Sequence, residues 1–422
     1  MSKFKNLLRP GARVVWRTTT YAKAMTVLDE AAWRLAKLLP KRSEERMQTL
    51  VMSPAGDGNI GDHAMLNAFL ENCDGPVTIL SSGVDSAIYP DRDSSRLVIK
   101  PMRSLFSYPP IIRFWSVFKF SRLLAGSRSF IIHGADTMDG SQISASLARL
   151  SLCRLASLEG IPSAVLGFSW SDESPKVVSD AVRAVSANTL LFPRDPLAHR
   201  RLKELKVSSL VPVTDMAFSL NTLEAPPRSV SSWITETASF QEEFVILNVS
   251  GLIANRFDQS KEIELVVSQI HSLGARVLFL PHVLRKGDDD LAICKKMHAL
   301  FGQPEDFLVE ELLTPEQVRS IASKARLTIT GRMHLSILSL GIGTPAIALS
   351  TAGKVEGLFE LFGQSEFVVD PVPGYGQIVV SKLKMLSVGR GQAIKAIETA
   401  LPSIRERSLM NFSTHNYSKA SD

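Results

Sequence analysis

The chain has 422 residues, which is too long for one compact core and suits two domains of ordinary size. Hydrophobic residues make up 45% of it and charged residues 21%, a balance that excludes wholesale disorder. The 3 cysteines lie far apart without a CxxC pair, which argues against a disulfide framework or a cysteine-zinc site. No apolar stretch is long enough to cross a membrane and no secretory signal opens the chain, so we expect a cytoplasmic location.

Positive charge is concentrated in the first residues. Residues 1–46 hold 11 Lys/Arg and 4 Asp/Glu, a formal charge of +7, and the chain as a whole carries +6, so the remainder is nearly neutral. A neutral body lacks the basic stripe of a nucleic-acid-binding domain, so we expect no nucleic-acid partner. The basic extension leaves one option open, which is contact with an anionic surface.

From residue 47 onward, short apolar runs alternate with helical stretches. The runs are rich in Val, Ile, Leu and Phe and do not alternate with polar residues, which is typical of parallel strands covered on both faces. Strands that alternate with helices predict βαβ units and an α/β fold. The predicted strands are 49–54, 76–80, 96–99, 129–134, 163–168, 189–192, 210–213, 244–250, 276–281, 326–330, 345–350 and 367–370.

The order of the runs predicts two Rossmann-like domains, at residues 47–220 and 242–405. A segment rich in Pro, Ser and Thr, residues 221–241, is the expected linker. Residues 1–46 form an extension and residues 406–422 a loose tail. Ligands of open parallel sheets bind beyond the carboxyl ends of the strands, so we sought candidate site residues directly after each predicted strand.

The first candidate segment is the glycine-rich stretch 56–65, which leads from a strand into a helix that begins near Asp62. Gly58 and Gly61 permit positive φ and close approach of a ligand to the backbone, and Asn59 between them is a further substrate-binding candidate. Free N–H groups at the helix start favour an anion or a polar sugar. The alternative is a tight turn that Asp62 caps.

Three later strand ends add one candidate each. Asp136 could orient sugar hydroxyls or act as a base, Arg194 could grip a carboxylate or phosphate, and His282 is a proton-transfer candidate. Their alternatives are a capped turn, a surface ion pair with the next residue, and a structural histidine. For the acidic run 288–290 we favour a solvated loop.

The most informative segment is residues 330–363. A strand delivers Arg332 and His334 at the start of a helix, and Lys354 follows the next strand near another helix start. Helix N-termini add partial positive charge. The three side chains therefore predict a cationic pocket for a small ligand that bears both phosphate and carboxylate. No HxxxH or HExxH spacing of metal ligands occurs, so we expect no metal.

Taken in order, these segments resemble the polysaccharide pyruvyl transferase family over roughly residues 50–365. The Arg-x-His helix followed by Gly-x-Pro and a Lys is the most specific part. The segments that carry the resemblance are GDGNIGDHAM, HGADTMDG, LGFSWSDESP, FPRDPLAHRRL, VTDMAFSL, LPHVLRKGDDD and GRMHLSILSLGIGTPAIALSTAGK.

The resemblance implies a GT-B-like pair of Rossmann domains and transfer of the enolpyruvyl unit of phosphoenolpyruvate to sugar hydroxyls, usually as a cyclic ketal. Phosphoenolpyruvate would be a co-substrate, with no separate cofactor. Arg332, His334 and Lys354 would face this donor. Arg194 matches the family's Arg-Asp segment and would add a further cation, and Asp62 would lie on the N-terminal wall. His334 is the candidate acid, and Asp136 or Asp62 would deprotonate or orient the acceptor, a glycan or its lipid-linked precursor.

Two other functions remain open from the sequence. A GT-B glycosyltransferase would use Arg332 and Lys354 to clasp the diphosphate of a nucleotide sugar. A non-catalytic glycan-binding scaffold would keep the fold without the chemistry.

Two basic, apolar segments raise the possibility of a peripheral contact with the cytoplasmic face of an anionic membrane. Residues 24–39 place Leu28, Ala31, Leu35 and Leu38 on one predicted helical face, and residues 103–126 combine Phe and Trp with basic side chains. Either segment could instead pack on the body of the protein. For residues 103–126 we favour a core helix with snorkelling cations.

Overall fold

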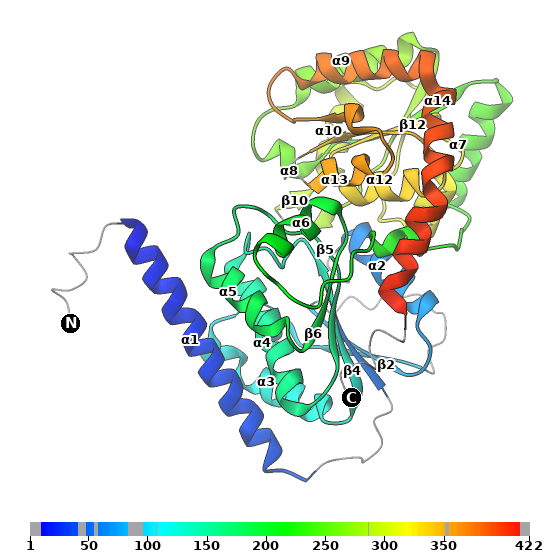
Figure 1. The fold of residues 1–422 in the computed structure, drawn as a ribbon. Helices are drawn as coiled ribbons and strands as arrows, with labels where there is room; N and C mark the ends of the chain where they lie inside the picture. Colours follow the sequence, from blue (N-terminus) through cyan, green and yellow to red (C-terminus); the bar gives the residue numbers. More distant parts are fainter. Residues whose placement is uncertain are drawn as a thin grey trace.

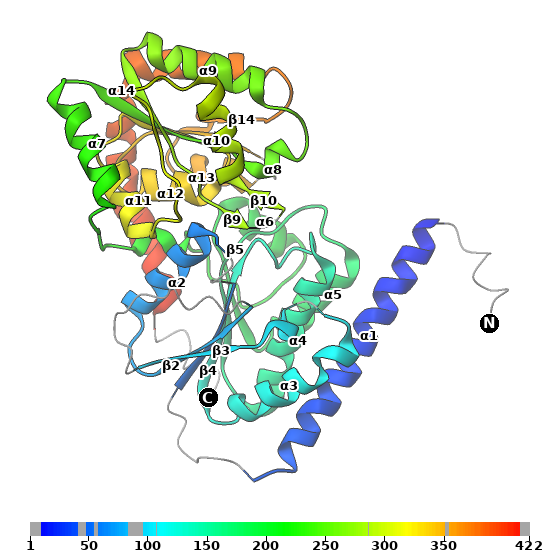
Figure 2. The ribbon, with the colours of Figure 1, turned by 180° about the vertical axis from the view of Figure 1, so that it is seen from behind.

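The computed structural model describes residues 10–40, 48–54, 58–82, 96–106, 108–285, 287–350 and 354–413, with the backbone alone for residues 10–18, Ala135 and Lys354. Figure 1 shows two α/β domains stacked along the long axis of the molecule, and Figure 2 shows the same arrangement from behind. Each domain has a parallel six-stranded sheet. The architecture confirms the predicted α/β fold with two Rossmann-like domains.

The N-terminal sheet has the strand order β3-β2-β1-β4-β5-β6, and all of its neighbouring strands are parallel. This is the order of a Rossmann sheet. The predicted strand 210–213 is wrong. Only an isolated bridge joins Leu191 and Leu210. The Val213 N–H still donates to the Pro193 carbonyl at 3.1 Å, but Pro193 has no N–H to return the next hydrogen bond of a ladder. The strands are β1 (Gln48–Ser53), β2 (Val77–Ser81), β3 (Leu97–Pro101), β4 (Ser127–Ala135), β5 (Ser163–Phe168) and β6 (Thr189–Pro193).

The C-terminal sheet repeats this topology with the order β11-β8-β7-β12-β13-β14. Its longer strands match the predicted runs, but the hairpin β9–β10 and the edge strand β11 have two residues per strand and no apolar run to reveal them. The strands are β7 (Glu243–Asn248), β8 (Ala275–Phe279), β9 (Leu284–Arg285), β10 (Asp288–Asp289), β11 (Phe307–Leu308), β12 (Leu327–Thr330), β13 (Ala346–Leu349) and β14 (Val368–Val369).

Helices cover both sheets and connect successive strands. In the N-terminal half they are α1 (Pro10–Lys37), α2 (Ile60–Asn72), η3 (Arg103–Leu105), α3 (Pro110–Leu124), α4 (Ile143–Glu159), α5 (Lys176–Val185), α6 (Pro196–Glu204) and η4 (Met216–Ser219). In the C-terminal half they are α7 (Arg228–Ser239), α8 (Gly251–Ala254), α9 (Ser260–Ser272), α10 (Asp290–Phe301), α11 (Pro315–Ala322), α12 (Met333–Leu340), α13 (Lys354–Glu360), η5 (Ser365–Phe367), α14 (Tyr375–Leu409) and η6 (Met410–Phe412).

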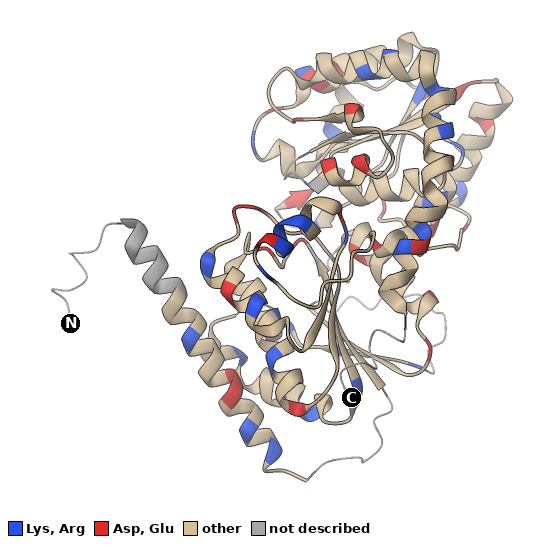
Figure 3. Cartoon of the chain, in the orientation of Figure 1, with Lys and Arg blue, Asp and Glu red and all other residues tan. Residues whose placement is uncertain are grey.

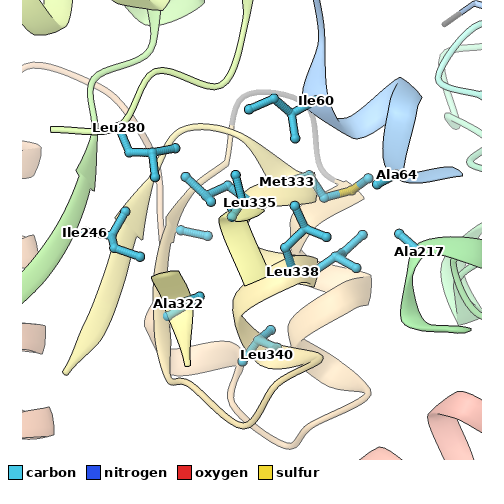
Figure 4. Close-up of a cluster of buried hydrophobic side chains, with 14 of the residues drawn as sticks. Ile60, Ala64, Ala217, Ile246, Leu280, Ala322, Met333, Leu335, Leu338 and Leu340 are labelled. Atoms are coloured by element: carbon cyan, nitrogen blue, oxygen red, sulfur yellow. The ribbon is translucent and has the colours of Figure 1, made fainter. Parts of the chain in front are cut away.

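One apolar core cluster joins the two domains. Figure 4 shows Ile60 and Ala64 of α2 and Ala217 of η4 beside Met333 and Leu338 of α12. All five side chains are at most 9% exposed. Burial of this shared apolar surface holds the carboxyl ends of the two sheets in a fixed relation.

The expected linker and tail are shorter than predicted. The second half of segment 221–241 is α7, which begins directly after Pro227, a position that suits a helix start. The C-terminal helix α14 crosses back to the N-terminal domain, as the red helix in Figure 1 shows. There the Ser408 Oγ donates to the Asp215 carbonyl at 2.8 Å, and Asn411 and Phe412 are buried. Residues 406–412 are therefore part of the fold rather than a tail.

The basic N-terminal helix α1 packs on α3 and α4 through a face that the sequence did not predict. Met25, Asp29, Ala32 and Ala36 are buried, and Asp29 forms a fully buried ion pair with Arg113 of α3 at 2.8 Å. The apolar face noted in the sequence, for which membrane contact and packing on the body both stayed open, carries Leu35 and Leu38, which are 39% and 79% exposed. The helix therefore packs through the side that carries the buried acid–base pair rather than through this apolar face.

The described part of α1 carries the basic residues Lys23, Arg34 and Lys37, and Figure 3 shows blue positions along this helix. Among the described helices, none combines the length and the apolar character needed to span a bilayer.

Candidate active site

The glycine-rich loop after β1 docks directly on the C-terminal domain. The Leu284 N–H donates to the Gly58 carbonyl at 2.8 Å, and the Ile60 N–H donates to the His282 carbonyl at 3.1 Å. Gly58 has φ of +69°, and a Cβ there would lie 2.2 Å from the Leu284 carbonyl oxygen. The predicted reason for these glycines was room for a ligand. At Gly58 the room is taken by the other domain.

A pocket of about 460 Å³ opens between the two domains beside this contact. Six of the predicted site residues line it, which are Asn59, Asp62, Asp136, His282, Arg332 and His334. Gly58, Gly61 and Arg194 are not among the residues that line it. The side chain of Lys354 lies outside the described residues, although its backbone begins α13 next to the lining residue Val355.

Arg332 is held by two carboxylates of the segment predicted to be a solvated loop. Its Nε donates to both oxygens of Asp290 at 3.2 Å, its Nη1 donates to Asp288 at 3.1 Å, and its Nη2 contacts both residues. One of the five guanidinium N–H groups remains for a ligand. Arg285 adds a second ion pair to Asp288 at 3.1 Å, so the four side chains together are formally neutral.

The expectation of a solvated acidic run is therefore wrong. Asp290 begins α10 and is fully buried, where it also accepts hydrogen bonds from Asn248 and from the N–H groups of Gly251 and His282. A buried carboxylate needs such partners to offset its lost hydration. The predicted cationic pocket is also corrected on this point, because Arg332 reaches the pocket with its charge already matched.

His334 stands in the first turn of α12 and is 8% exposed. Its Nε2 lies 3.5 Å from Oδ2 of Asp215, a distance that suits an ion pair when the ring is protonated. Gly61 packs against the other side of the ring, and a Cβ at that position would lie 2.4 Å from the His334 Nδ1. Gly61 and Asp215 therefore fix the imidazole from two sides.

Behind His334, Arg194 links two aspartates. Its Nη1 donates to Oδ2 of Asp215 at 2.7 Å, and its Nη2 pairs with Asp136. Burial opposes ionisation of Asp215, but the neighbouring His334 and Arg194 outweigh it and lower the pKa of this carboxyl to about 2. Arg194 is 4% exposed and is not among the residues that line the interdomain pocket; its guanidinium faces Asp136 and Asp215.

Asp62 faces the same space from the start of α2. The Asn59 Nδ2 donates to its Oδ2 at 2.8 Å, while the Asn59 Oδ1 accepts from the Gly61 N–H at 3.0 Å and so caps the helix. Burial raises the pKa of the Asp62 carboxyl, against the opposing effects of His334, Arg285 and Asn59. Asp62 is therefore the pocket carboxyl that holds its proton more readily than an ordinary aspartate.

His282 is 1% exposed, and within the described residues neither of its ring nitrogens has a hydrogen-bond partner. Burial, with His334, Arg332 and His63 nearby, keeps its pKa well below the ordinary value. A neutral imidazole in the pocket wall can offer one N–H and one lone pair to a ligand. It is not placed to carry charge.

Sequence reasoning missed three functional residues of this site. Asp215 follows the run 210–213, so the rule applied to other strand ends would have found it. Asp290 was hidden in a polar run. Arg149 of α4 lines the pocket from a helix whose neighbouring positions Ala145 and Leu152 are buried. An arginine within an apolar helical stripe was the available signal.

The chemistry of the lining suits a small polar ligand. It combines a histidine that a buried aspartate supports, a carboxyl with a raised pKa, and arginines on both walls. No group of three or more His, Cys, Asp and Glu side chains in the described ranges is arranged to hold a metal ion.

Two solved structures with a similar fold were determined with a uridine nucleotide or nucleotide sugar bound. The UDP-GlcNAc 2-epimerase from Neisseria meningitidis, bound to UDP-GlcNAc, has a TM-score of 0.55 at 12% identity, covering 87% of this chain and 99% of that one. HepE of Anabaena, in complex with UDP and glucose, has a TM-score of 0.55 at 10% identity, covering 87% and 98%. At such identities the likeness shows the fold alone, which is GT-B-like, as the resemblance implied.

No match to an individual curated protein sequence was found. A sequence model of the polysaccharide pyruvyl transferase family matches residues 59–353, which is more than half of the chain and includes most of the pocket residues described above. With its two facing Rossmann domains and the Arg332-x-His334 helix between them, the chain belongs to the polysaccharide pyruvyl transferase family.

Proposed function

We propose that this transferase moves the enolpyruvyl unit of phosphoenolpyruvate onto two hydroxyls of a sugar in a surface polysaccharide or its lipid-linked precursor. The observation that carries the proposal is the placement of His334. Its ring lines the interdomain pocket while its Nε2 lies 3.5 Å from the buried carboxylate of Asp215. A carboxylate in this position orients the imidazole, which is the candidate group for giving a proton to the donor.

The reaction balances with phosphoenolpyruvate and a diol alone. A proton adds to the terminal CH₂ carbon and leaves the central carbon electrophilic. One sugar hydroxyl attacks that carbon, the C–O bond to phosphate breaks, and the second hydroxyl closes the ketal. Of the two hydroxyl protons released, one balances the new methyl group and the other leaves with phosphate. The donor carries its own leaving group, so we propose no metal and no separate cofactor.

The described residues divide between the two substrates. His334 is the proposed acid toward the donor, and Asp62 and Asp136 are the proposed residues that orient or deprotonate the acceptor hydroxyls. Asp62 and Asp136 come from the N-terminal domain and His334 from the C-terminal domain. Attack across the interface of the domains would place the acceptor on the N-terminal wall. Lys354 remains a proposed donor contact.

Phosphate release separates this function from its rivals. The purified protein is incubated with phosphoenolpyruvate and candidate saccharides, and inorganic phosphate is measured. We expect release that depends on the acceptor, and a loss of at least about 100-fold in His334→Ala, as for removal of a general acid. Matched folding of this variant is checked by circular dichroism.

A nucleotide product from a UDP-sugar, without phosphate release from phosphoenolpyruvate, would favour the glycosyltransferase. Undiminished biological activity of both His334→Ala and Arg332→Ala would favour a non-catalytic scaffold.

We also propose that α1 and α3 rest on an anionic membrane surface, where a lipid-linked acceptor would be found. Basic side chains flank the apolar ones, with Lys23 and Arg34 on α1 and Lys119 on α3 exposed. Interfacial helices combine these features. The exposed apolar side chains are Val27, Leu35 and Leu38 on α1 and Ile111, Ile112 and Trp115 on α3.

Point variants test this contact better than deletion of the extension, because deletion would leave Arg113 buried without Asp29. We expect Ile111→Ser with Trp115→Ser to weaken binding to phosphatidylglycerol vesicles. Val388→Ser, at a position on α14 that is 92% exposed, is the matched control. Equal sedimentation of all three proteins with the vesicles would contradict the contact.

A further inference from the structure

Arg149 is a buried pocket cation that has no carboxylate partner within the described residues. It lies in the middle of α4, is 3% exposed and lines the interdomain pocket. Its Nη1 donates to the Ala145 carbonyl of its own helix at 3.1 Å, and its Nε is buried without a hydrogen-bond partner. The described residues therefore leave the guanidinium incompletely satisfied.

The other arginines of the site are matched by acids. Arg332 and Arg285 pair with Asp288 and Asp290, and Arg194 pairs with Asp136 and Asp215. Burial lowers the pKa of Arg149 to about 10, so the side chain remains charged near neutral pH. An unpaired buried charge opposes folding unless something supplies the missing counter-charge.

The surroundings of Arg149 suit an oxyanion. The Phe106 ring lies 5.5 Å from the guanidinium carbon and packs against it, which limits the positions the side chain can take. Thr137, Ser141 and Gln142 line the same pocket and precede the 17-residue helix α4 in the chain. The Gln142 side chain makes no capping hydrogen bond to this helix. The dipole of this helix favours negative charge at its N-terminus.

We propose that Arg149, with the N-terminal turn of α4, binds one oxyanion of the donor, a phosphate or a carboxylate. The identity of the donor rests on the proposed function. Phosphoenolpyruvate carries two anionic groups, and the acid-matched Arg332 has one free N–H to offer. Arg149, on the N-terminal wall, supplies the net positive charge that the C-terminal wall lacks. The donor would then bridge the two domains, with its reacting carbons near His334.

Calorimetric titration of the full-length protein with phosphoenolpyruvate, and separately with inorganic phosphate and pyruvate, tests the site. We expect Arg149→Met to lower the affinity for phosphoenolpyruvate by about 30-fold or more, as for loss of one partner of a buried charge pair. Arg149→Lys keeps the charge without the planar fork and should bind with intermediate affinity. The matched control is Arg154→Met on the outer face of α4, where Arg154 pairs with Glu30 at 2.7 Å.

Thermal unfolding distinguishes a loss of binding from a loss of the folded structure. Arg149→Met removes no ion pair among the described residues, so its melting temperature without ligand should equal or exceed that of the wild type. Phosphoenolpyruvate should raise the melting temperature of the wild type and of Arg154→Met but not that of Arg149→Met. If Arg149→Met fails to fold, Arg149→Lys is compared with the wild type in the same binding and melting measurements.

The titrations separate this inference from the proposed function. The phosphate and pyruvate arms tell which oxyanion Arg149 holds. If the wild type binds phosphate but not phosphoenolpyruvate, and Arg149→Met loses phosphate, the anion site stands and the proposed donor falls. Equal affinity of the wild type and Arg149→Met for phosphoenolpyruvate overturns the inference. So does a wild-type protein that binds no oxyanion.

Discussion

The two walls of the pocket treat their buried arginines differently. On the C-terminal wall Arg332 lies between Asp288 and Asp290, whereas on the N-terminal wall Arg149 has no carboxylate partner in the described ranges. A buried charge that pairs with a counter-ion from the protein contributes to the stability of the fold. One without a counter-ion creates a place for a ligand of opposite sign. Substitution of Arg332 should therefore act mainly on stability, and substitution of Arg149 mainly on binding.

The largest expected effect tests this contrast directly. Arg332→Met leaves Asp290 fully buried without its cation and should lower the free energy of unfolding by about 3–5 kcal/mol. Arg149→Met, measured by urea unfolding under the same conditions, should lose little or become more stable. Equal destabilisation of the two variants would show that the two walls do not differ in this way.

Gly61 extends the comparison to the contact between the walls. A Cβ at this position would lie 2.4 Å from the His334 Nδ1, so Gly61→Ala must displace the ring. We expect a loss of about 1–3 kcal/mol in stability and at least about tenfold in phosphate release. Gly391→Ala in α14, where no atom lies within 4 Å, is the control and should be neutral or slightly stabilising. Unchanged activity in Gly61→Ala would contradict the fixed ring.

Two aspartates of the site differ in the same way. The pKa of Asp215, which has cationic neighbours, is lowered, and the pKa of the buried Asp62 is raised. Asp215, with a pKa of about 2, stabilises the protein above its ordinary pKa of 3.8, and this contribution is lost as the pH falls toward 2. Asp62 has a raised pKa, so its contribution is present below 3.8 and is lost as the pH rises through its value in the folded protein.

At neutral pH, Asp215→Asn should therefore cost about 2 kcal/mol of unfolding free energy. Asp62→Asn should gain stability relative to the wild type as the pH is raised from about 4 to about 7. Urea unfolding across this range measures both variants. If the differences in unfolding free energy between each variant and the wild type changed with pH in the same direction, the opposite pKa shifts of Asp215 and Asp62 would be refuted.

The sequence predicted where the site lies better than it predicted which charged side chains pair within it. The rule that ligands bind at the carboxyl ends of parallel strands brought Asp62, Asp136, His282, Arg332 and His334 to one pocket. Pairing depends on contacts between segments far apart in the chain, such as Arg332 with Asp290, which no local pattern encodes. The same holds for the two glycines, whose close contacts are with the opposite domain.

The fold was predictable for a similar reason. Apolar runs covered on both faces reveal buried parallel strands such as β1, β5 and β7 from local composition alone. Two-residue strands such as β9 carry no such pattern. The rotation of α1 depends on the buried pair of Asp29 and Arg113, which lie 84 positions apart and unite only in the folded chain.

Isotope tracing tests the central claim most directly. The protein is incubated with carbon-13-labelled phosphoenolpyruvate and the lipid-linked glycans of its own cell, and the glycans are analysed by mass spectrometry. We predict a labelled product heavier by one pyruvate less one water, formed together with one inorganic phosphate and absent with His334→Ala. Label that stays entirely in phosphoenolpyruvate, with a hexose added from a UDP-sugar instead, would contradict the account.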